Sequence, residues 1–300
     1  MRSLCPSRPA STTPRQANRA CTAARVLVAL AIASISGCAG NSDVERGTQR
    51  FFDDVGHGVL GDRSSHEDLL VPVSGVINVE VHNFAGNVIV RGDRSDRTTD
   101  AMVIVDRRGA HRGSRSEESE QSLPDMQWKA ELVPAATPDQ DPTLRITTNT
   151  THAEPWFQRM EIEVLVGELG RVDIVSTRGK VQVVNNRGPV DINTTKGDVR
   201  VITTWPQKSD TVIMTTDGDI DFRVRGESAF TLDAESVGGL VKSRCEAGRW
   251  VATDARNDHD SMVATLNAGG ARVTLRTVDG DIRVAVVGDP HAVGSFQIAP

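Results

Sequence analysis

The sequence predicts an all-β protein in which a β-strand meander precedes a β-solenoid of the right-handed β-helix type, with about twenty residues per coil. From Gly75 onward, apolar and polar residues alternate with the period of a half-buried strand. Glycines then recur at regular spacing, each with the same residue types around it. Aromatic residues make up only 4% of the chain, which suits the narrow interior of a solenoid.

Residues 1–37 have the composition of an export signal. Five arginines and no acidic residue precede an apolar run from Val26 to Ile35, which is too short to span a bilayer comfortably. The following "ISGC" resembles the lipobox of bacterial lipoproteins, and this resemblance implies that Cys38 is acylated, as by palmitate, and becomes the mature N-terminus. Because Ile35 stands where leucine is usual, an ordinary signal peptide with a chance cysteine is the alternative. Ala39, in place of the inner-membrane aspartate, favours the outer membrane over the inner membrane.

Loss of this signal changes the charge and the cysteine count. The whole chain carries a net charge of −6 from 34 basic and 40 acidic residues, and removal of the five arginines makes the mature chain more acidic still. This balance argues against a nucleic-acid partner and is typical of a solvated envelope protein. Cys5 and Cys21 leave with the signal and Cys38 carries lipid, so Cys245 remains without an intrachain disulfide partner.

Residues 38–72 are polar and are predicted to tether residues 73–300, the β-repeat domain, to the membrane. The segment between Arg107 and Ser122 has no large apolar residue and is predicted to be a mobile loop. After the alternating stretch that begins at Gly75, further strand patterns of the meander lie at Ala101–Asp106, Met126–Val133, Leu144–Thr150 and Met160–Val166.

The repeat is defined by what surrounds its glycines. Valine or isoleucine stands two residues after each one, a hydroxyl or amide side chain stands three before, and an apolar residue stands five before. Glycine can adopt the backbone conformation that a tight turn requires. The polar residue three positions earlier can form a ladder of hydrogen bonds between stacked coils. The structural turn glycines predicted in this way are Gly86, Gly179, Gly188, Gly197, Gly218, Gly239 and Gly280. Of these, Gly188 falls in a second series of turns, midway along the coils, so that each coil holds two strands and two turns. The interval between Gly239 and Gly280 is twice the usual period, which predicts a further coil centred on Asp260, with Asn257 in its polar column and Met262 in its apolar column.

The units "STRGKVQV", "TTKGDVRV", "TTDGDIDF" and "TVDGDIRV", together with "VEVHNFAGNVIV", resemble the bacterial putative-adhesin family of unknown function that is built from β-strand repeats. The resemblance covers about residues 75–290. It implies an all-β repeat domain without catalytic residues that could be transferred to this chain.

The acids near the turns raise the question of chemistry. Asp219 and Asp221 lie on one face of a predicted strand after Asp217, and Asp279 and Asp281 repeat the pattern, so the carboxylates could cleave a glycoside or bind calcium. The simpler interpretation is turn chemistry. Asp198, Asp219 and Asp281 directly follow a turn glycine, and in an earlier unit Lys180 occupies that place, which is expected of a solvated turn position.

Other candidates carry weaker signals. The stretch around His259 could ligate a metal, although one histidine in a turn is usually solvated. Cys245 has no recognisable partner and is predicted to be packed rather than nucleophilic. Trp205 and Trp250 could stack on sugars, although corners of the solenoid are the simpler place for them.

These observations predict a lipid-anchored envelope protein with a structural or adhesive β-repeat domain. We expect no catalytic, cofactor or metal site, a membrane contact through the lipid, and an envelope protein or polysaccharide as partner. The alternatives are a polysaccharide-active β-helix enzyme, because β-helices often carry acidic clefts, and a periplasmic sensor or accessory module.

Overall fold

The structure is a computed structural model that describes residues 63–92, 100–111, 115–252, 259–293 and 297–298. Its strands in the first half are β1 (Arg63–Val71), β2 (Val76–Asn83), β3 (Val88–Arg91), β4 (Ala101–Gly109), β5 (Met126–Val133), β6 (Thr143–Thr150), β7 (Gln158–Leu165), β8 (Glu168–Arg178), β9 (Val181–Val184) and β10 (Val190–Lys196). The strands that follow are β11 (Val199–Ile202), β12 (Thr211–Asp217), β13 (Ile220–Arg225), β14 (Phe230–Ser236), β15 (Val241–Cys245), β16 (Trp250–Ala252), β17 (Ser261–Leu266), β18 (Ala271–Asp279), β19 (Ile282–Val287) and β20 (Gln297–Ile298). The helical elements are α2 (Ser116–Gln121) and the single 3₁₀ turns η2 (Leu123–Asp125) and η3 (Pro155–Phe157).

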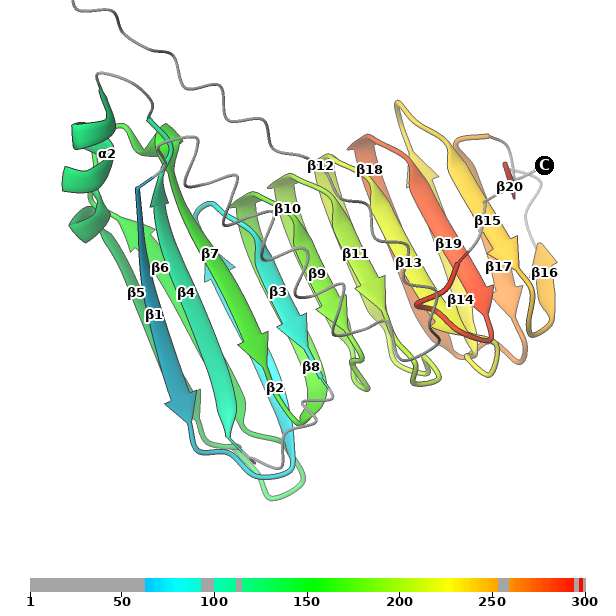
Figure 1. The fold of residues 1–300 in the computed structure, drawn as a ribbon. Helices are drawn as coiled ribbons and strands as arrows, with labels where there is room; N and C mark the ends of the chain where they lie inside the picture. Colours follow the sequence, from blue (N-terminus) through cyan, green and yellow to red (C-terminus); the bar gives the residue numbers. More distant parts are fainter. Residues whose placement is uncertain (1–62, 93–99, 112–114, 253–258, 294–296, 299–300) are drawn as a thin grey trace, which may run out of the picture. The chain divides into compact units, whose positions relative to one another are not determined.

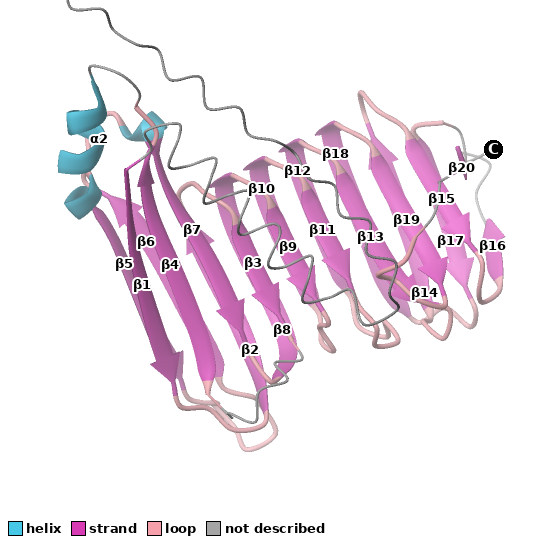
Figure 2. Ribbon diagram, in the orientation of Figure 1, coloured by secondary structure: helices cyan, strands magenta, loops and turns pink. Residues whose placement is uncertain are grey.

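The described strands form two sheets of ten strands each (Figures 1 and 2). One sheet, called sheet A here, has the order β1-β4-β7-β3-β9-β11-β13-β19-β15-β20. The other, sheet B, has the order β16-β17-β14-β18-β12-β10-β8-β2-β6-β5. Each coil gives one strand to each sheet, as β10 and β11 do, and equivalent strands pair in parallel. The prediction of an all-β, solenoid-type fold is therefore confirmed, with two sheets that are not closed on each other.

Alternation along each strand places the core between the sheets. In β10 the inward Val190, Ile192 and Thr194 are buried, whereas the residues between them are exposed. Their partners in β8 and β12 continue the same columns, so that Ile192 lies between Ile174 and Ile213. Larger rings fill the later coils, where Phe222 meets Phe230 edge to face at 6.0 Å between ring centroids. The interior is thus built from stacked β-branched residues, as expected for a pleated surface buried on one face.

The coils do not stack in chain order, and two of them are intercalated. Strands β18 and β19 lie between the coil of β12 and β13 and the coil of β14 and β15. Strands β2 and β3 likewise lie between the coil of β6 and β7 and the coil of β8 and β9. Figure 1 shows both insertions, with cyan β3 beside green β7 and red-orange β19 beside yellow β15.

This order corrects the prediction of a coil centred on Asp260. Residues after Asp260 form β17, which pairs antiparallel with β14 and places Met262 opposite Ala234. Met262 is buried, so its apolar position was predicted correctly although its coil was not. Asn257, which was assigned to the polar column, lies outside the described residues. The double interval between Gly239 and Gly280 therefore contains antiparallel strands instead of a second coil.

Antiparallel strands finish both ends of the stack. At one end β4 pairs with β7 and with β1, and β5 pairs with β6; at the other, β17 pairs with β14 and with β16. Strand β1 covers residues 63–71, which were assigned to the tether, so the sheet begins earlier than predicted. Such end strands shield the apolar faces of the terminal coils, which a repeat array needs for solubility.

Part of the predicted mobile loop is ordered. Strand β4 continues to Gly109, and α2 packs next to it, with Ser119 fully buried. A Cβ on Gly109 would lie 2.7 Å from Ser119 Cβ, so glycine is needed for this close approach. The hydroxyl of Ser119 accepts a hydrogen bond from the backbone N–H of His111 at 2.8 Å. Among the described residues, no helix has the length and apolar character that a membrane span requires.

Candidate functional site along the glycine column

Six of the seven predicted turn glycines stack into one column at the edge of the sheets. In spatial order they are Gly86, Gly179, Gly197, Gly218, Gly280 and Gly239. A Cβ on any of the last five would lie only 2.1–2.3 Å from the carbonyl oxygen of the preceding glycine. Gly197 and Gly218 also have φ values of 143° and 155°. Close approach and backbone conformation both require glycine here, which makes this column structural.

Gly188 does not belong to the column, in agreement with its prediction as one of the midway turns. It lies at the opposite turns of the coils, where its N–H donates to the carbonyl of Gly170 at 3.2 Å. Asn185, three residues earlier, has φ of 60° and accepts hydrogen bonds from Thr204 instead of joining the polar column. The nine-residue spacing of Gly188 from its neighbours placed it half a coil away from them.

Buried hydroxyls reinforce the column. Thr277 Oγ1 donates to the carbonyl of Gly218 at 2.9 Å. Ser236 Oγ donates to the carbonyl of Gly280 at 2.7 Å and accepts from the N–H of Gly239 at 2.9 Å. Each hydroxyl therefore connects its own turn to the adjacent coil, so that buried turn carbonyls find donors.

The residue after each glycine forms a second ladder. The N–H of Asp281 donates to Asp219 Oδ1 at 2.8 Å, and the N–H of Asp219 donates to Asp198 Oδ1 at 3.2 Å. The N–H of Leu240 donates to Asp281 Oδ1 at 3.0 Å. The ammonium nitrogen of Lys180 lies 3.1 Å from Asp198 Oδ2. These acids connect neighbouring coils, which corrects the prediction that they occupy a merely solvated turn position.

Asp219 and Asp221, the two acids predicted to lie on one strand face, also form ion pairs with arginines. Asp219 Oδ2 lies 2.9 Å from Arg283 Nη2. Asp221 is buried and receives two hydrogen bonds of 2.7 Å from Arg223, with Arg200 Nε at 3.2 Å. Both carboxylates are thus saturated by cations or backbone donors, in the manner of structural charge networks.

The surroundings of two ladder acids favour their charged forms. Desolvation acts to raise the pKa of Asp198, but Lys180 and the N–H of Asp219 outweigh it and the pKa is lowered. The hydrogen bond from Lys242 is the largest cause of a lowered pKa at Asp281. These carboxylates contribute to the free energy of unfolding at pH values above their pKa in the unfolded chain. This contribution is lost as the pH falls through their pKa in the folded protein. A general acid near neutral pH needs the opposite shift.

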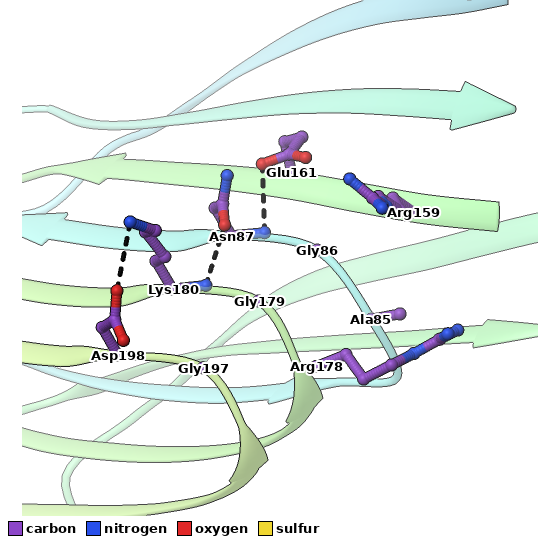
Figure 3. A pocket seen from close by; sticks show the side chains of 10 residues that line it. All are labelled: Ala85, Gly86, Asn87, Arg159, Glu161, Arg178, Gly179, Lys180, Gly197 and Asp198. Atoms are coloured by element: carbon purple, nitrogen blue, oxygen red, sulfur yellow. Dashed lines mark hydrogen bonds and ion pairs between the residues drawn. The ribbon is translucent and has the colours of Figure 1, made fainter. Parts of the chain in front are cut away.

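A pocket of 280 Å³ opens at one end of the glycine column (Figure 3). Its lining residues come from β7, the turn before β3, and the turns that lead into β9 and β11. They are Ala85, Gly86, Asn87, Arg159, Glu161, Arg178, Gly179, Lys180, Gly197 and Asp198. The glycines leave the pocket without side chains along its floor, and charged side chains stand around it.

Both carboxyls of the pocket, Glu161 and Asp198, have shifted pKa values, and that of Glu161 is raised. Glu161 is largely desolvated, and this burial raises its pKa although Arg108 and the N–H of Asn87 act to lower it. The N–H of Asn87 donates to Glu161 Oε2 at 3.0 Å. Glu161 therefore continues the ladder of side-chain acceptors at the end of the stack, in the coil that precedes Gly86 in space.

Two arginines of the pocket have no carboxylate within salt-bridge distance among the described residues. The side chain of Arg159 is exposed and forms no ion pair there. Arg178 donates from Nη1 to the carbonyl oxygen of Trp156 at 3.1 Å. The ring of Trp156 is 54% exposed and meets His111 edge to face at 4.8 Å. The sequence patterns missed these residues, because β7 was not expected to neighbour β3.

The other predicted candidates do not converge on this pocket. Cys245 is exposed, which corrects the prediction that it is packed, and desolvation raises the pKa of its thiol. Trp205 stacks under the guanidinium of Arg187 at 3.9 Å from its ring centroid, and Trp250 packs edge to face with Phe230. The described part of the chain contains no group of three or more His, Cys, Asp or Glu side chains placed to hold a metal ion. Cys38 lies outside the described residues.

Comparison with known proteins supports the repeat assignment. Residues 158–285 match the family model described as Toastrack DUF4097, which confirms the resemblance to a β-repeat family over this range. The match begins at β7, so the intercalated coil of β2 and β3 lies outside it. No curated protein shows a significant match to the chain.

Several solved structures match the chain at low sequence identity and with TM-scores below 0.5. A putative cell adhesion protein from Clostridium sporogenes ATCC 15579 is 10% identical and matches with a TM-score of 0.49 over 74% of this chain and 99% of its own. A putative adhesin from Bacteroides fragilis NCTC 9343 is 9% identical, with a TM-score of 0.25 over 74% of this chain and 97% of its own. A putative lipid binding protein from Parabacteroides distasonis ATCC 8503 is 12% identical, with a TM-score of 0.20 over 76% and 95%.

Proposed function

We propose that this protein, whose residues 158–285 match the Toastrack DUF4097 family model, is a lipid-anchored component of the cell envelope. Its β-repeat domain would be a non-enzymatic structural or adhesive surface. The observation that carries this proposal is the regular ladder of glycines, hydroxyls and acids across the coils. The ladder joins neighbouring coils through hydrogen bonds, so it supports a rigid surface on which a partner can bind.

The state of the acids supports a non-catalytic role. A glycosidase needs two carboxyl groups that flank a substrate, one of them with a raised pKa. Asp219 and Asp221 are instead engaged by Arg283, Arg223 and Arg200 and take part in holding the coils together. Active sites commonly break the local rule that the rest of a fold obeys, and these acids follow the rule.

Hydrolysis assays test this point. We expect the purified protein to leave common envelope polysaccharides intact, and the double variant Asp219→Asn with Asp221→Asn to retain any binding that the parent shows. Turnover by the parent that disappears in the double variant would establish the polysaccharide-active enzyme instead. A melting curve of the double variant serves as the control for folding, because both acids hold ion pairs.

The sequence "ISGC" supports the anchor. A single acyl chain gives only marginal membrane binding, whereas the two or more chains of a bacterial lipoprotein hold stably. Together with Ala39, this motif favours attachment to the outer membrane.

Cys38→Ala is expected to move the protein from the membrane fraction to the soluble envelope fraction, because the variant has no thiol to acylate. The measurement is fractionation with detergent partitioning, and mass spectrometry of the N-terminal peptide identifies the lipid. Cys245→Ala is the matched control and should remain in the membrane. If the Cys38→Ala variant partitions like the parent protein, the lipid anchor is disproved.

A further inference from the structure

We propose that the pocket at the end of the glycine column binds the carboxylate of an acidic sugar unit in an anionic polysaccharide, held by Arg159 and Arg178. The inference rests on the proposed adhesive function and names the class of ligand that the surface would take. It uses residues that neither the repeat pattern nor the ladder accounts for.

The first observation is an imbalance of charge at the pocket. Lys180 lies 3.1 Å from Asp198, so this pair is internally compensated. Arg159 and Arg178 have no such carboxylate among the described residues. Most other arginines near these coils are paired, as Arg200 and Arg223 are with Asp221. A guanidinium offers a planar fork of donors that matches a carboxylate, so two forks without a carboxylate at salt-bridge distance among the described residues favour an anionic ligand at this pocket.

The second observation is the arrangement of strands that places these charges together. Arg159 lies directly opposite Arg108 across the β4–β7 pair. Both arginines act electrostatically on Glu161, which lies on the same strand as Arg159. The pairing of β4 with β7 thus brings a group of charged side chains to the pocket at the end of the glycine column.

The third observation is the formal charge of the residues that line the pocket. Its three cationic side chains, Arg159, Arg178 and Lys180, exceed its two acids, Glu161 and Asp198, by one. Burial raises the pKa of Glu161, although Arg108, Arg159 and the N–H of Asn87 act to lower it. The lining therefore carries an excess of positive charge that suits an anionic ligand.

The size and rim of the pocket agree with one sugar unit of a longer chain. Its volume of 280 Å³ lies just below the range of about 300–1,000 Å³ typical for drug-sized ligands. Trp156 is exposed, and its backbone carbonyl oxygen accepts a hydrogen bond from Arg178 of the pocket. An exposed indole has an apolar face against which a sugar ring can pack, and neighbouring units of the polymer would extend along the solvent-exposed turns.

The experiment titrates trigalacturonate into the full-length protein at low salt, with calorimetry and tryptophan fluorescence as readouts. We expect saturable binding that weakens with added salt, and no binding of the methyl-esterified trimer, which lacks the charges. Arg159→Gln with Arg178→Gln should weaken binding about tenfold or more, as expected when charge-assisted hydrogen bonds are lost. Inorganic phosphate is titrated in parallel, and tighter binding of phosphate would assign the site to phosphorylated instead of uronic-acid polymers.

A matched control removes the same charge elsewhere. Arg171→Gln with Arg225→Gln replaces two exposed arginines that pair with Asp173 and Glu227 outside the pocket. Equal affinity of the two double variants, equal binding of the methyl ester, or absence of binding by every probe would each overturn the proposal. Melting curves of both variants exclude unfolding as the cause. Fractionation of the Cys38→Ala variant does not depend on this pocket, so failure of the ligand proposal and failure of the anchor are separable.

Discussion

Replacing Gly218 with alanine is expected to lower the free energy of unfolding by about 2–6 kcal/mol, which combines backbone strain with overpacking. The new Cβ would lie 2.3 Å from the carbonyl oxygen of Gly197, and Gly218 has φ of 155°. The obstructing atom is backbone inside a stack, so it cannot rotate away as a flexible side chain could. The corresponding decrease in Tm is roughly 5–20 °C for a domain of this size, measured by calorimetry or circular dichroism.

Gly288→Ala is the matched control, because a Cβ there meets no atom within 4 Å and the residue has no positive φ. It should change Tm by less than about 2 °C, as surface substitutions do. Equal melting of the Gly218→Ala and Gly288→Ala variants would show that the glycine column is not packed as the structure describes.

A chain that ends after Gly269 is expected to lose cooperative folding of its C-terminal coils. In a solenoid stacked in chain order, this truncation would remove a terminal coil and leave the others paired. Here it removes β18 and β19, which lie inside the stack between two other coils. Inward residues of the flanking strands, such as Ile213 and Leu232, would lose the neighbours that pair with them on one side. Limited proteolysis and thermal melting measure the effect.

The matched control ends the chain after Gly288 and keeps β18 and β19. It removes β20, whose two residues pair with the edge of β15. This shorter truncation should melt cooperatively close to the full-length protein. If the chain ending after Gly269 also melts cooperatively within a few degrees of it, the coils stack in chain order.

The repeating columns could be predicted from the sequence because they are local. Whether a side chain faces the core depends on the period of two along its own strand, and the turn glycine lies within a few residues of the hydroxyl and the valine that accompany it. The buried Ile192 and Val199 on either side of Gly197 follow from this pattern in one coil, without knowledge of any other. The family match over residues 158–285 has the same origin, because it covers the units where the pattern is most regular.

The chemistry of individual positions depended on their neighbours in the adjacent coil. Asp219 looked like a solvated turn residue, but its Oδ1 accepts the N–H of Asp281, which lies 62 residues away. Cys245 looked like a packed residue, but it lies at the exposed end of β15. Gly188 matched the residue pattern and still belongs to the opposite turns, because strands of similar composition follow both kinds of turn.

The sequence by itself determined the fold class, the inward columns and the six stacked glycines. Only the tertiary structure decided the order of the coils, and with it the neighbours of Gly86, Gly280 and Glu161. The physical reason is that every coil carries the same columns of valine, hydroxyl and glycine, so any coil can pair with any other at similar energy. The choice is made by non-local contacts, in which the antiparallel end strands separate consecutive coils and bring β7 beside β3. The pocket between Arg159 and Arg178 exists only because of that arrangement.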